Sequence, residues 1–256
     1  METQIWTVQR IMDWTQSYFT KAGIESARLD TEVLLAHVLK ENRIFLYTHF
    51  DRPLSGEERD QFRAMVKRRA QREPVAYILG EKEFYGRPFL VNQHTLIPRP
   101  ETEHLIDGIL KWENQGRGNL GGDGPLKVLD IGTGTGCIGI TLAAEIENAE
   151  VTAVDISVEA LKMASVNAAT LGVESKIRFL EGDLLSSVQG ETFDLIVSNP
   201  PYVEEKERAN LSPDVVDFEP ESALFAGDDG MNIIRRLVVD AALNLVPGGL
   251  FAMEFG

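Results

Sequence analysis

The sequence predicts an α/β fold, in which a mostly parallel sheet with helices on both faces follows a small region built only of helices. From residue 127 onward, short apolar runs alternate with helix-length segments, which is the pattern of βαβ units. Residues 1–74 show helical spacing of apolar side chains instead. The charge also divides, because residues 1–87 hold 14 basic and 13 acidic side chains and residues 88–256 hold 11 and 27. Such different charges indicate two domains.

The first region is expected to be a helical domain over residues 1–74. Apolar periodicity predicts helices over residues 5–20, 26–42 and 55–73. Ser26 is expected to cap the second helix, which would turn Leu29 toward the core. Ser55 and Glu58 have the form of a capping box at the start of the third. The basic side chains of that third helix form either a solvated face or a docking surface for an acidic or RNA-rich partner: Arg63, Lys67, Arg68, Arg69 and Arg72.

Residues 75–100 are expected to be a linker that contains a hairpin. Apolar residues alternate over 84–91 around Gly86, which is typical of two short strands and a turn. A helix is predicted over residues 102–113. Five glycines within residues 114–125 then indicate a flexible loop.

The remainder, residues 101–256, is expected to form the sheet domain. Strands are predicted over residues 127–131, 151–155, 177–180, 193–198 and 249–255, with helices over 137–146, 158–171 and 231–245. Ligands of such sheets bind outside the carboxyl ends of the strands. This rule brings four polar segments to one edge: residues 130–136, 155, 182–183 and 199–202.

The glycine turn after the first strand indicates a site for a cofactor that contains a nucleoside. Glycines let a ligand approach the backbone, and the start of the following helix favours a carboxylate or phosphate. Asp155 ends the next strand, 19 residues after Gly136, where a carboxylate can accept hydrogen bonds from both hydroxyls of a ribose. The turn residues are Gly132, Thr133, Gly134, Thr135 and Gly136.

Two cofactors fit this turn. Residues 134–139 match the G-x-G-x-x-G fingerprint of dinucleotide sites, so a nicotinamide-dependent dehydrogenase is one alternative. Asp130, which precedes the turn, would repel a pyrophosphate but suits the ammonium group of an amino-acid tail. S-adenosylmethionine (SAM) has such a tail, a ribose and an adenine, so we expect SAM. Asp183 would accept a hydrogen bond from the adenine amino group, and Leu184 would contact the ring.

The segment after the fourth strand, Asn199-Pro200-Pro201-Tyr202, indicates chemistry on a planar NH₂ group. The Asn199 side chain and the Pro200 carbonyl are two fixed acceptors, which can hold both hydrogens of an amide or exocyclic amine. Tyr202 offers a flat ring to cover the substrate. Since the nitrogen becomes positive as a methyl group arrives, acceptors aimed at its hydrogens strengthen in the transition state.

Together these residues resemble the HemK/PrmC family, the glutamine N5-methyltransferases that modify peptide chain release factors. The resemblance covers nearly the whole chain and includes residues 84–89, 96–103, 130–136, 199–202, 218–220 and 226–230. The Asn-Pro-Pro-Tyr motif alone is shared with DNA and RNA amine methyltransferases, which remain an alternative. Combined with Pro98-Arg-Pro-Glu-Thr-Glu103 it is much more specific.

The resemblance implies a class I SAM-dependent methyltransferase domain and assigns roles by position. SAM would contact Asp130, the glycine turn, Asp155, Asp183, Leu184 and Asn199. The glutamine of a Gly-Gly-Gln motif in class I release factors would be gripped by Asn199, Pro200, Pro201 and Tyr202, of which Asn199, Pro200 and Tyr202 are the catalytic candidates. The helices of residues 1–74 would contact another part of the release factor. The family often has tryptophan where Leu184 stands, so we expect weaker stacking on adenine.

The resemblance also implies a further antiparallel pair of strands after residue 256, which we expect to be lacking here. The strand at residues 249–255 would then be an exposed edge, with a cost in stability relative to a longer chain.

Composition excludes several other classes of site. A single cysteine, Cys137, allows no internal disulfide and no cysteine-built zinc site, and the four histidines lack ligand spacing. No apolar run is long enough to span a membrane, and the start of the chain has no signal-peptide pattern. The acidic second region disfavours a direct nucleic-acid substrate. We therefore expect a cytoplasmic enzyme that is monomeric and holds no metal.

Overall fold

The computed structural model describes residues 5–116 and 124–255, which form two compact units, one ending at Leu79 and the other beginning at Gly80. The glycine-rich loop expected over residues 114–125 falls largely outside the described residues. In the described part of the chain, no helix is long and apolar enough to cross a membrane.

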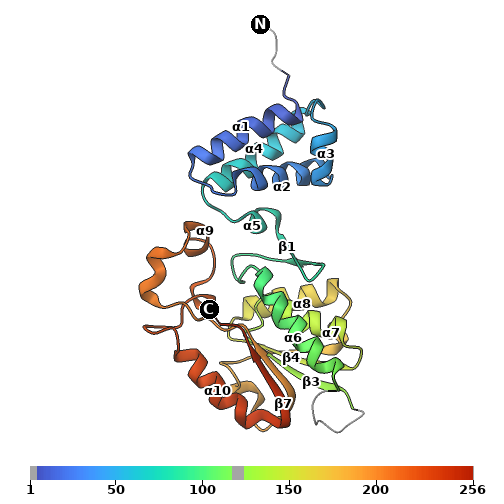
Figure 1. Cartoon of the computed structure of the whole chain (residues 1–256), viewed down its shortest axis with the longest axis vertical. Coiled ribbons are helices and arrows are strands. Elements are labelled where there is room, and N and C mark those ends of the chain that lie inside the picture. The colour runs from blue at the N-terminus through green and yellow to red at the C-terminus, as the bar shows by residue number, and fades with distance from the viewer. Residues whose placement is uncertain (1–4, 117–123, 256) are drawn as a thin grey trace. The chain divides into compact units, whose positions relative to one another are not determined.

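The first unit consists of helices, drawn in blue to cyan in Figure 1. They are α1 (Val8–Lys21), α2 (Ala27–Leu39), α3 (Arg43–Thr48), α4 (Gly56–Ala70) and α5 (Val75–Leu79). The capping box at the start of α4 is confirmed, because the Ser55 hydroxyl accepts from the Glu58 N–H and the Glu58 carboxylate accepts from the Ser55 N–H. Side chains from α1, α2 and α4 build the core, with Phe19, Leu34 and Phe62 almost fully buried.

Three details of this unit differ from the predictions. Ser26 makes no capping hydrogen bond to the backbone, since its hydroxyl donates to the side chain of Asp30. Leu29, expected in the core, is exposed on the outer face of α2. The chain leaves α2 at Leu39, because Lys40 takes a left-handed conformation, and α3 was not predicted.

The second unit contains a hairpin and a parallel sheet. The hairpin of β1 (Glu81–Phe84) and β2 (Arg87–Leu90) is antiparallel around Gly86, as predicted. It is not a free linker, since Phe84 and Phe89 are buried in the core of the sheet unit. After it come η1 (Pro100–Thr102) and α6 (Glu103–Asn114).

The sheet has five parallel strands in the order β5-β4-β3-β6-β7, which confirms the predicted α/β fold with a parallel sheet. The strands are β3 (Leu126–Ile131), β4 (Ala149–Asp155), β5 (Ile177–Glu181), β6 (Phe193–Ser198) and β7 (Leu245–Met253). The helices between them are α7 (Cys137–Glu145), α8 (Val158–Thr170), α9 (Pro213–Val216) and α10 (Asn232–Asn244). Short turns η2 (Glu174–Lys176), η3 (Ser186–Val188), η4 (Glu205–Asn210) and η5 (Glu221–Ala223) complete the unit.

The two faces of the sheet have separate cores, as the alternation of side chains along a strand requires. Val128 and Leu195 pack with α6, α7 and α8, whereas Leu129 and Ile196 pack with α10. Figure 1 shows these helices on opposite sides of the strands. The order of the strands places β3 between β4 and β6, and the loops at their carboxyl ends meet at one edge.

Candidate active site

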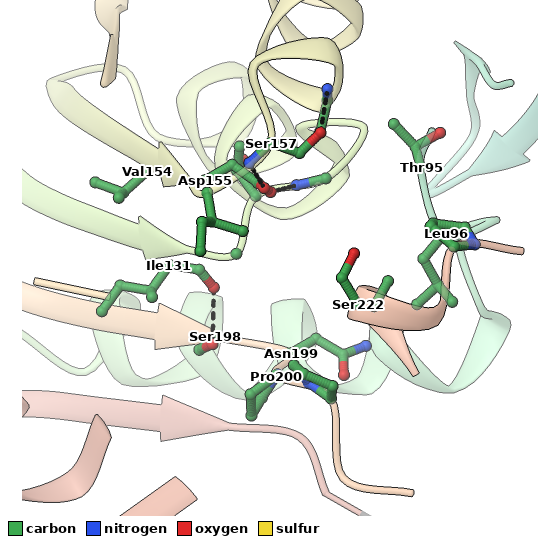
Figure 2. Close-up of a pocket in the computed structure, with 18 of the residues that line it drawn as sticks. Thr95, Leu96, Ile131, Val154, Asp155, Ser157, Ser198, Asn199, Pro200 and Ser222 are labelled. Carbon is green, nitrogen blue, oxygen red and sulfur yellow. Dashed lines mark hydrogen bonds between the residues drawn. The ribbon is translucent and has the colours of Figure 1, made fainter. Parts of the chain in front are cut away.

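A cavity of about 420 Å³ lies at the carboxyl ends of β3, β4, β5 and β6, where the sequence predicted it. All its walls belong to the sheet unit. In Figure 2, Asp155 from the end of β4 and Asn199 from the end of β6 lie on two sides of the same space, Leu96 reaches it from a loop, and Ser222 reaches it from η5. The predicted site residues on its wall are Gly132, Thr133, Gly134, Thr135, Asp155, Asp183, Leu184, Asn199, Pro200 and Pro201.

The glycine turn depends on glycine for its shape. Gly132, Gly134 and Gly136 all have positive φ angles, of 70°, 56° and 81°. A Cβ atom on Gly136 would lie 2.5 Å from Cδ1 of Ile140, so the turn also packs tightly on α7. In this turn, the Gly134 N–H donates a hydrogen bond to the Asp155 carboxylate, with an N···O distance of 2.8 Å.

Asp155 joins the turn to the start of α8. One carboxylate oxygen accepts from the Gly134 N–H and the other from the Ser157 N–H at 2.9 Å, as the dashed lines of Figure 2 show. Burial raises the pKa of this carboxyl group, and backbone hydrogen bonds from Ser157, Gly134 and Ile156 oppose that effect. Because each oxygen keeps a lone pair, the carboxylate can accept further hydrogen bonds from a ligand in the cavity.

Asp130 lies behind the turn and does not line the cavity. Its side chain is fully buried, and Oδ2 accepts from the Thr133 hydroxyl at 2.6 Å and from the Gly139 N–H at 3.0 Å. The other oxygen, Oδ1, has no hydrogen-bond partner among the described residues. Burial raises the pKa of Asp130 to about 6. Asp130 therefore acts on the turn itself through Oδ2, and its contact with a ligand ammonium stays a prediction.

Asp183 and Leu184, which follow β5, also line the cavity. The Asp183 carboxylate forms an ion pair with Arg236 of α10 at 2.6 Å, and Arg236 also lines the cavity. Leu184 has a positive φ angle of 52°. Sequence reasoning missed Arg236, because nothing in its local pattern indicates that α10 brings it next to a loop 53 residues away.

The segment after β6 places Asn199, Pro200 and Pro201 on the cavity wall. The Asn199 Nδ2 atom donates to the Thr102 hydroxyl oxygen at 3.2 Å. Just before it, the Ser198 hydroxyl donates to the Ile131 carbonyl at 2.7 Å, which ties the end of β6 to the end of β3. Tyr202 is half-buried but does not line the cavity, and burial together with nearby Glu254 raises its pKa. Tyr202 therefore belongs to the predicted segment but does not line the cavity, and its contact with a substrate stays a prediction.

A second group on the wall comes from residues 94–102, where the sequence assigned no role to Arg99. Arg99 lines the cavity and pairs with the buried carboxylate of Glu219 at 2.6 Å. The other Glu219 oxygen accepts from the Ile97 N–H at 3.0 Å. The motifs at residues 96–103 and 218–220 were both recognised in the sequence, but their contact depends on the tertiary fold.

Other candidate chemistry finds no support in the described part of the chain. No group of three or more potential ligand side chains is arranged to hold a metal ion there. Burial raises the pKa of the Cys137 thiol to about 12, so this thiol is not activated as a nucleophile.

Comparisons with known families match both units. The model described as "PrmC N-terminal domain" matches residues 10–80, and "Methyltransferase small domain" matches residues 121–217. The catalytic domain of hMettl16, solved in complex with the MAT2A 3′UTR hairpin 6, is similar in fold, with a TM-score of 0.50 at 18% identity over 71% of this chain and 65% of that one.

Similar sequences extend over both units. A release factor glutamine methyltransferase of Rhodopirellula baltica is 43% identical over 97% of this chain and 83% of its own length. One of Koribacter versatilis is 44% identical over 98% of this chain and 86% of its own. From the fold, the cavity and these relatives together, the chain belongs to the release factor glutamine methyltransferases, SAM-dependent enzymes with the class I fold.

Proposed function

We propose that this protein transfers a methyl group from SAM to the side-chain amide nitrogen of the glutamine in the Gly-Gly-Gln motif of class I peptide chain release factors. One observation carries the proposal. Asp155, which can bind a ribose, and the acceptors of Asn199 and Pro200, which can bind an amide NH₂ group, line the same cavity. Family membership adds the class of protein substrate.

The side chains and backbone groups that line the cavity fit SAM. The glycine turn brings backbone close to the ligand, Asp155 keeps free lone pairs for ribose hydroxyls, and Leu184 offers apolar surface for the adenine. Asp183 would accept from the adenine amino group through the oxygen that does not contact Arg236. We infer that Asp130 supports the methionine end by shaping the turn and by its charge. Bound SAM supplies a methyl group on a sulfonium sulfur, which is electrophilic without any metal.

The residues after β6 would hold the substrate amide. The Asn199 Oδ1 atom and the Pro200 carbonyl oxygen accept no hydrogen bond from the described residues, so both are available for the two N–H groups of a glutamine side chain. These acceptors strengthen as the nitrogen forms its bond to carbon and becomes positive. The extra proton leaves to water after transfer. Tyr202, which follows Pro201 of the cavity wall, would cover the glutamine when the substrate is bound.

We further propose that the helical unit recognises a separate part of the release factor. A groove of about 530 Å³ lies between α1 and α4. Trp14 and Tyr18 stack on one wall with ring centroids 5.2 Å apart, and Trp14 is 52% exposed. Three basic side chains line the other wall: Arg59, Arg63 and Lys67. Aromatic and basic walls together suit an acidic segment that also carries apolar side chains.

The alternatives explain less. A nicotinamide-dependent dehydrogenase has no use for the amide acceptors after β6. A nucleic-acid amine methyltransferase would use the same acceptors, but the acidic charge of residues 88–256 opposes a phosphate backbone. We also propose that the enzyme acts on its release factor in the cytoplasm and as a monomer.

The experiment that tests the proposal offers three acceptors in parallel: unmodified release factor, DNA and ribosomal RNA, each with SAM labelled in its methyl group. Label should enter the release factor alone, and a release factor with the motif glutamine changed to alanine should remain unlabelled. Label in DNA or RNA would overturn the choice of substrate. A failure to bind SAM would overturn the cofactor assignment.

A further inference from the structure

One buried side chain, Asn167 of α8, joins the hairpin to the glycine turn. Only 1% of its surface is exposed, and it does not line the cavity. Its Oδ1 atom accepts from the Leu90 N–H of β2 at 2.8 Å, and its Nδ2 atom donates to the Leu90 carbonyl at 3.0 Å and to the Thr135 carbonyl at 2.9 Å. Because a backbone N–H only donates and a backbone carbonyl only accepts, these three contacts permit a single orientation of the amide.

The second half of the glycine turn depends on this contact. The first half is held by β4, through the N–H groups of residues 132–134. The peptide between Thr135 and Gly136 has one contact at each end: its N–H donates to the Thr133 carbonyl at 2.8 Å, and its carbonyl accepts from Asn167. Gly136 has a φ angle of 81°, and a glycine leaves such a peptide free to rotate unless hydrogen bonds hold it. Asn167 therefore keeps the Thr135 carbonyl behind the cavity wall.

Both supports of Asn167 are themselves rigid. Helix α8 packs directly on the turn, since a Cβ atom on Gly136 would lie 3.2 Å from Cβ of Ala164. Ala164 and Asn167 are three positions apart, so they lie on the same face of the helix. On the other side, the hairpin is anchored by Phe84 and Phe89, which are buried in the same core as α7 and α8. The amide thus connects two well-packed elements to one mobile peptide.

We propose that Asn167 is a positioning residue for the cofactor, which holds the Thr135 carbonyl so that the turn is already in its SAM-binding conformation before SAM arrives. The hairpin of residues 81–90 serves as the support for this contact. The inference goes beyond the proposed function, because it depends on SAM as the cofactor and not on the identity of the methyl acceptor.

The cost of losing the contact falls on SAM binding rather than on chemistry. Without the amide, the Thr135 carbonyl is released from its only described partner, and the peptide can turn this acceptor toward the cavity. SAM must then order the turn as it binds, and this ordering lowers its affinity. Asn199 and Pro200 follow a different strand, β6, so the groups that would hold the methyl acceptor stay in place.

The test uses an alanine change with a matched control. Asn167→Ala removes all three contacts. Asn244→Ala is the control, because Asn244 of α10 also donates to two backbone carbonyls, those of Val188 and Glu191, and none of these residues lines the cavity. We expect Asn167→Ala to raise the Kd for SAM about tenfold, the effect of about one lost hydrogen bond. Asn244→Ala should bind SAM like the wild type, although it too loses stability.

Asn167→Asp separates the two supports. The aspartate keeps an acceptor for the Leu90 N–H, but its carboxylate has no donor for the Thr135 carbonyl. It should weaken SAM binding at least as much as the alanine does. If the aspartate variant does not fold, the comparison of Asn167→Ala with Asn244→Ala decides the question.

Two further measurements separate positioning from a merely structural role. Hydrogen exchange of the turn without SAM, followed on peptides that include Gly136, should be about tenfold faster in Asn167→Ala than in the wild type, and unchanged in Asn244→Ala. At saturating SAM and release factor, kcat of Asn167→Ala should stay within twofold of the wild type.

Four results would overturn the inference: wild-type SAM affinity in Asn167→Ala or Asn167→Asp, an equal loss of affinity in Asn244→Ala, unchanged exchange at the turn, or a kcat that falls tenfold at saturation. The proposed function fails separately. A wild-type protein that binds SAM but leaves the release factor unmethylated would contradict the choice of substrate, while the SAM affinities of the variants would still test Asn167.

Discussion

At the scale of single residues, Asn199 is the side chain whose removal should separate chemistry from cofactor binding. Its free oxygen faces the substrate in our account, and its amide nitrogen is occupied by Thr102. Asn199→Ala should lower kcat by at least tenfold, because an acceptor that strengthens in the transition state is lost. Isothermal titration should find little change in SAM affinity. A large loss of SAM binding would contradict this division of roles.

Asp155 should show the opposite behaviour. Its carboxylate holds the Gly134 and Ser157 N–H groups and, in our account, the ribose hydroxyls. Asp155→Ala should weaken SAM binding by about 10- to 100-fold, since about 1.5–3 kcal/mol of charge-assisted hydrogen bonding is lost. Asp155→Asn, which keeps the volume and one acceptor, should lose less. Unchanged affinity in the alanine variant would mean that the ribose binds elsewhere.

Asp130 gives a prediction on the pH dependence of stability. Burial raises its pKa to about 6, above the ordinary value of 3.8, so its contribution to stability is fully present below pH 4 and is lost as the pH rises through 6. The asparagine of Asp130→Asn cannot ionise. Relative to the wild type, that variant should gain stability between pH 4 and pH 7, by on the order of 3 kcal/mol. Urea unfolding at several pH values measures the difference, and a difference that stays constant with pH would refute it.

At the scale of elements, the β3–turn–α7 unit shows what the sequence could and could not predict. The alternation of strands and helices and the glycine spacing predicted the turn at the edge of the sheet, because both are local signals. No local signal predicts in which direction a side chain near the turn points. Asp130 points back into the turn, to Thr133 and Gly139, and leaves the ligand side to the backbone. The short helices α3 and α5 were also missed, since six and five residues are too few to show a period.

Gly136 and Gly172 form a matched pair for testing this turn. Both have left-handed φ angles, of 81° and 72°, but a Cβ atom would meet Ile140 at 2.5 Å only at Gly136, and nothing within 4 Å at Gly172. Gly172→Ala should cost about 1–2 kcal/mol of stability from backbone strain. Gly136→Ala should cost more and should also weaken SAM binding, because the buried Ile140 side chain must shift beside the turn. Equal losses in the two variants, measured by urea unfolding, would contradict the tight packing of the turn.

At the scale of the whole molecule, our account assigns recognition of the substrate to the helical unit and the chemistry to the sheet unit. The charge asymmetry of the sequence indicated this division, and the cavity with its Asn-Pro-Pro segment lies wholly in the second unit. Three long-range contacts of the cavity lay beyond sequence reasoning: Asn199 with Thr102, Arg99 with Glu219, and Asp183 with Arg236. Each joins residues 53 or more positions apart, so no local pattern contains them.

The groove of the helical unit should affect substrate binding alone. Arg59→Glu combined with Lys67→Glu should raise the KM for the release factor about tenfold, because two attractive charges become repulsive. The kcat at saturating release factor and the SAM affinity should not change. Lys21→Glu with Lys40→Glu is the control, since both lysines are exposed in the same unit and lie outside the groove. Equal KM values in the two double variants would exclude the groove as the docking surface.

The central claim is that the cavity methylates a glutamine side chain, and fragment-ion mass spectrometry of the reacted release factor tests it most directly. The protein, SAM and unmodified release factor are mixed, and the product is digested and sequenced in the spectrometer. We predict one added methyl group, on the side chain of the glutamine in the Gly-Gly-Gln motif, which Asn199→Ala adds at least tenfold more slowly. A methyl group on any other residue, or none on a release factor that binds alongside SAM, would contradict the account.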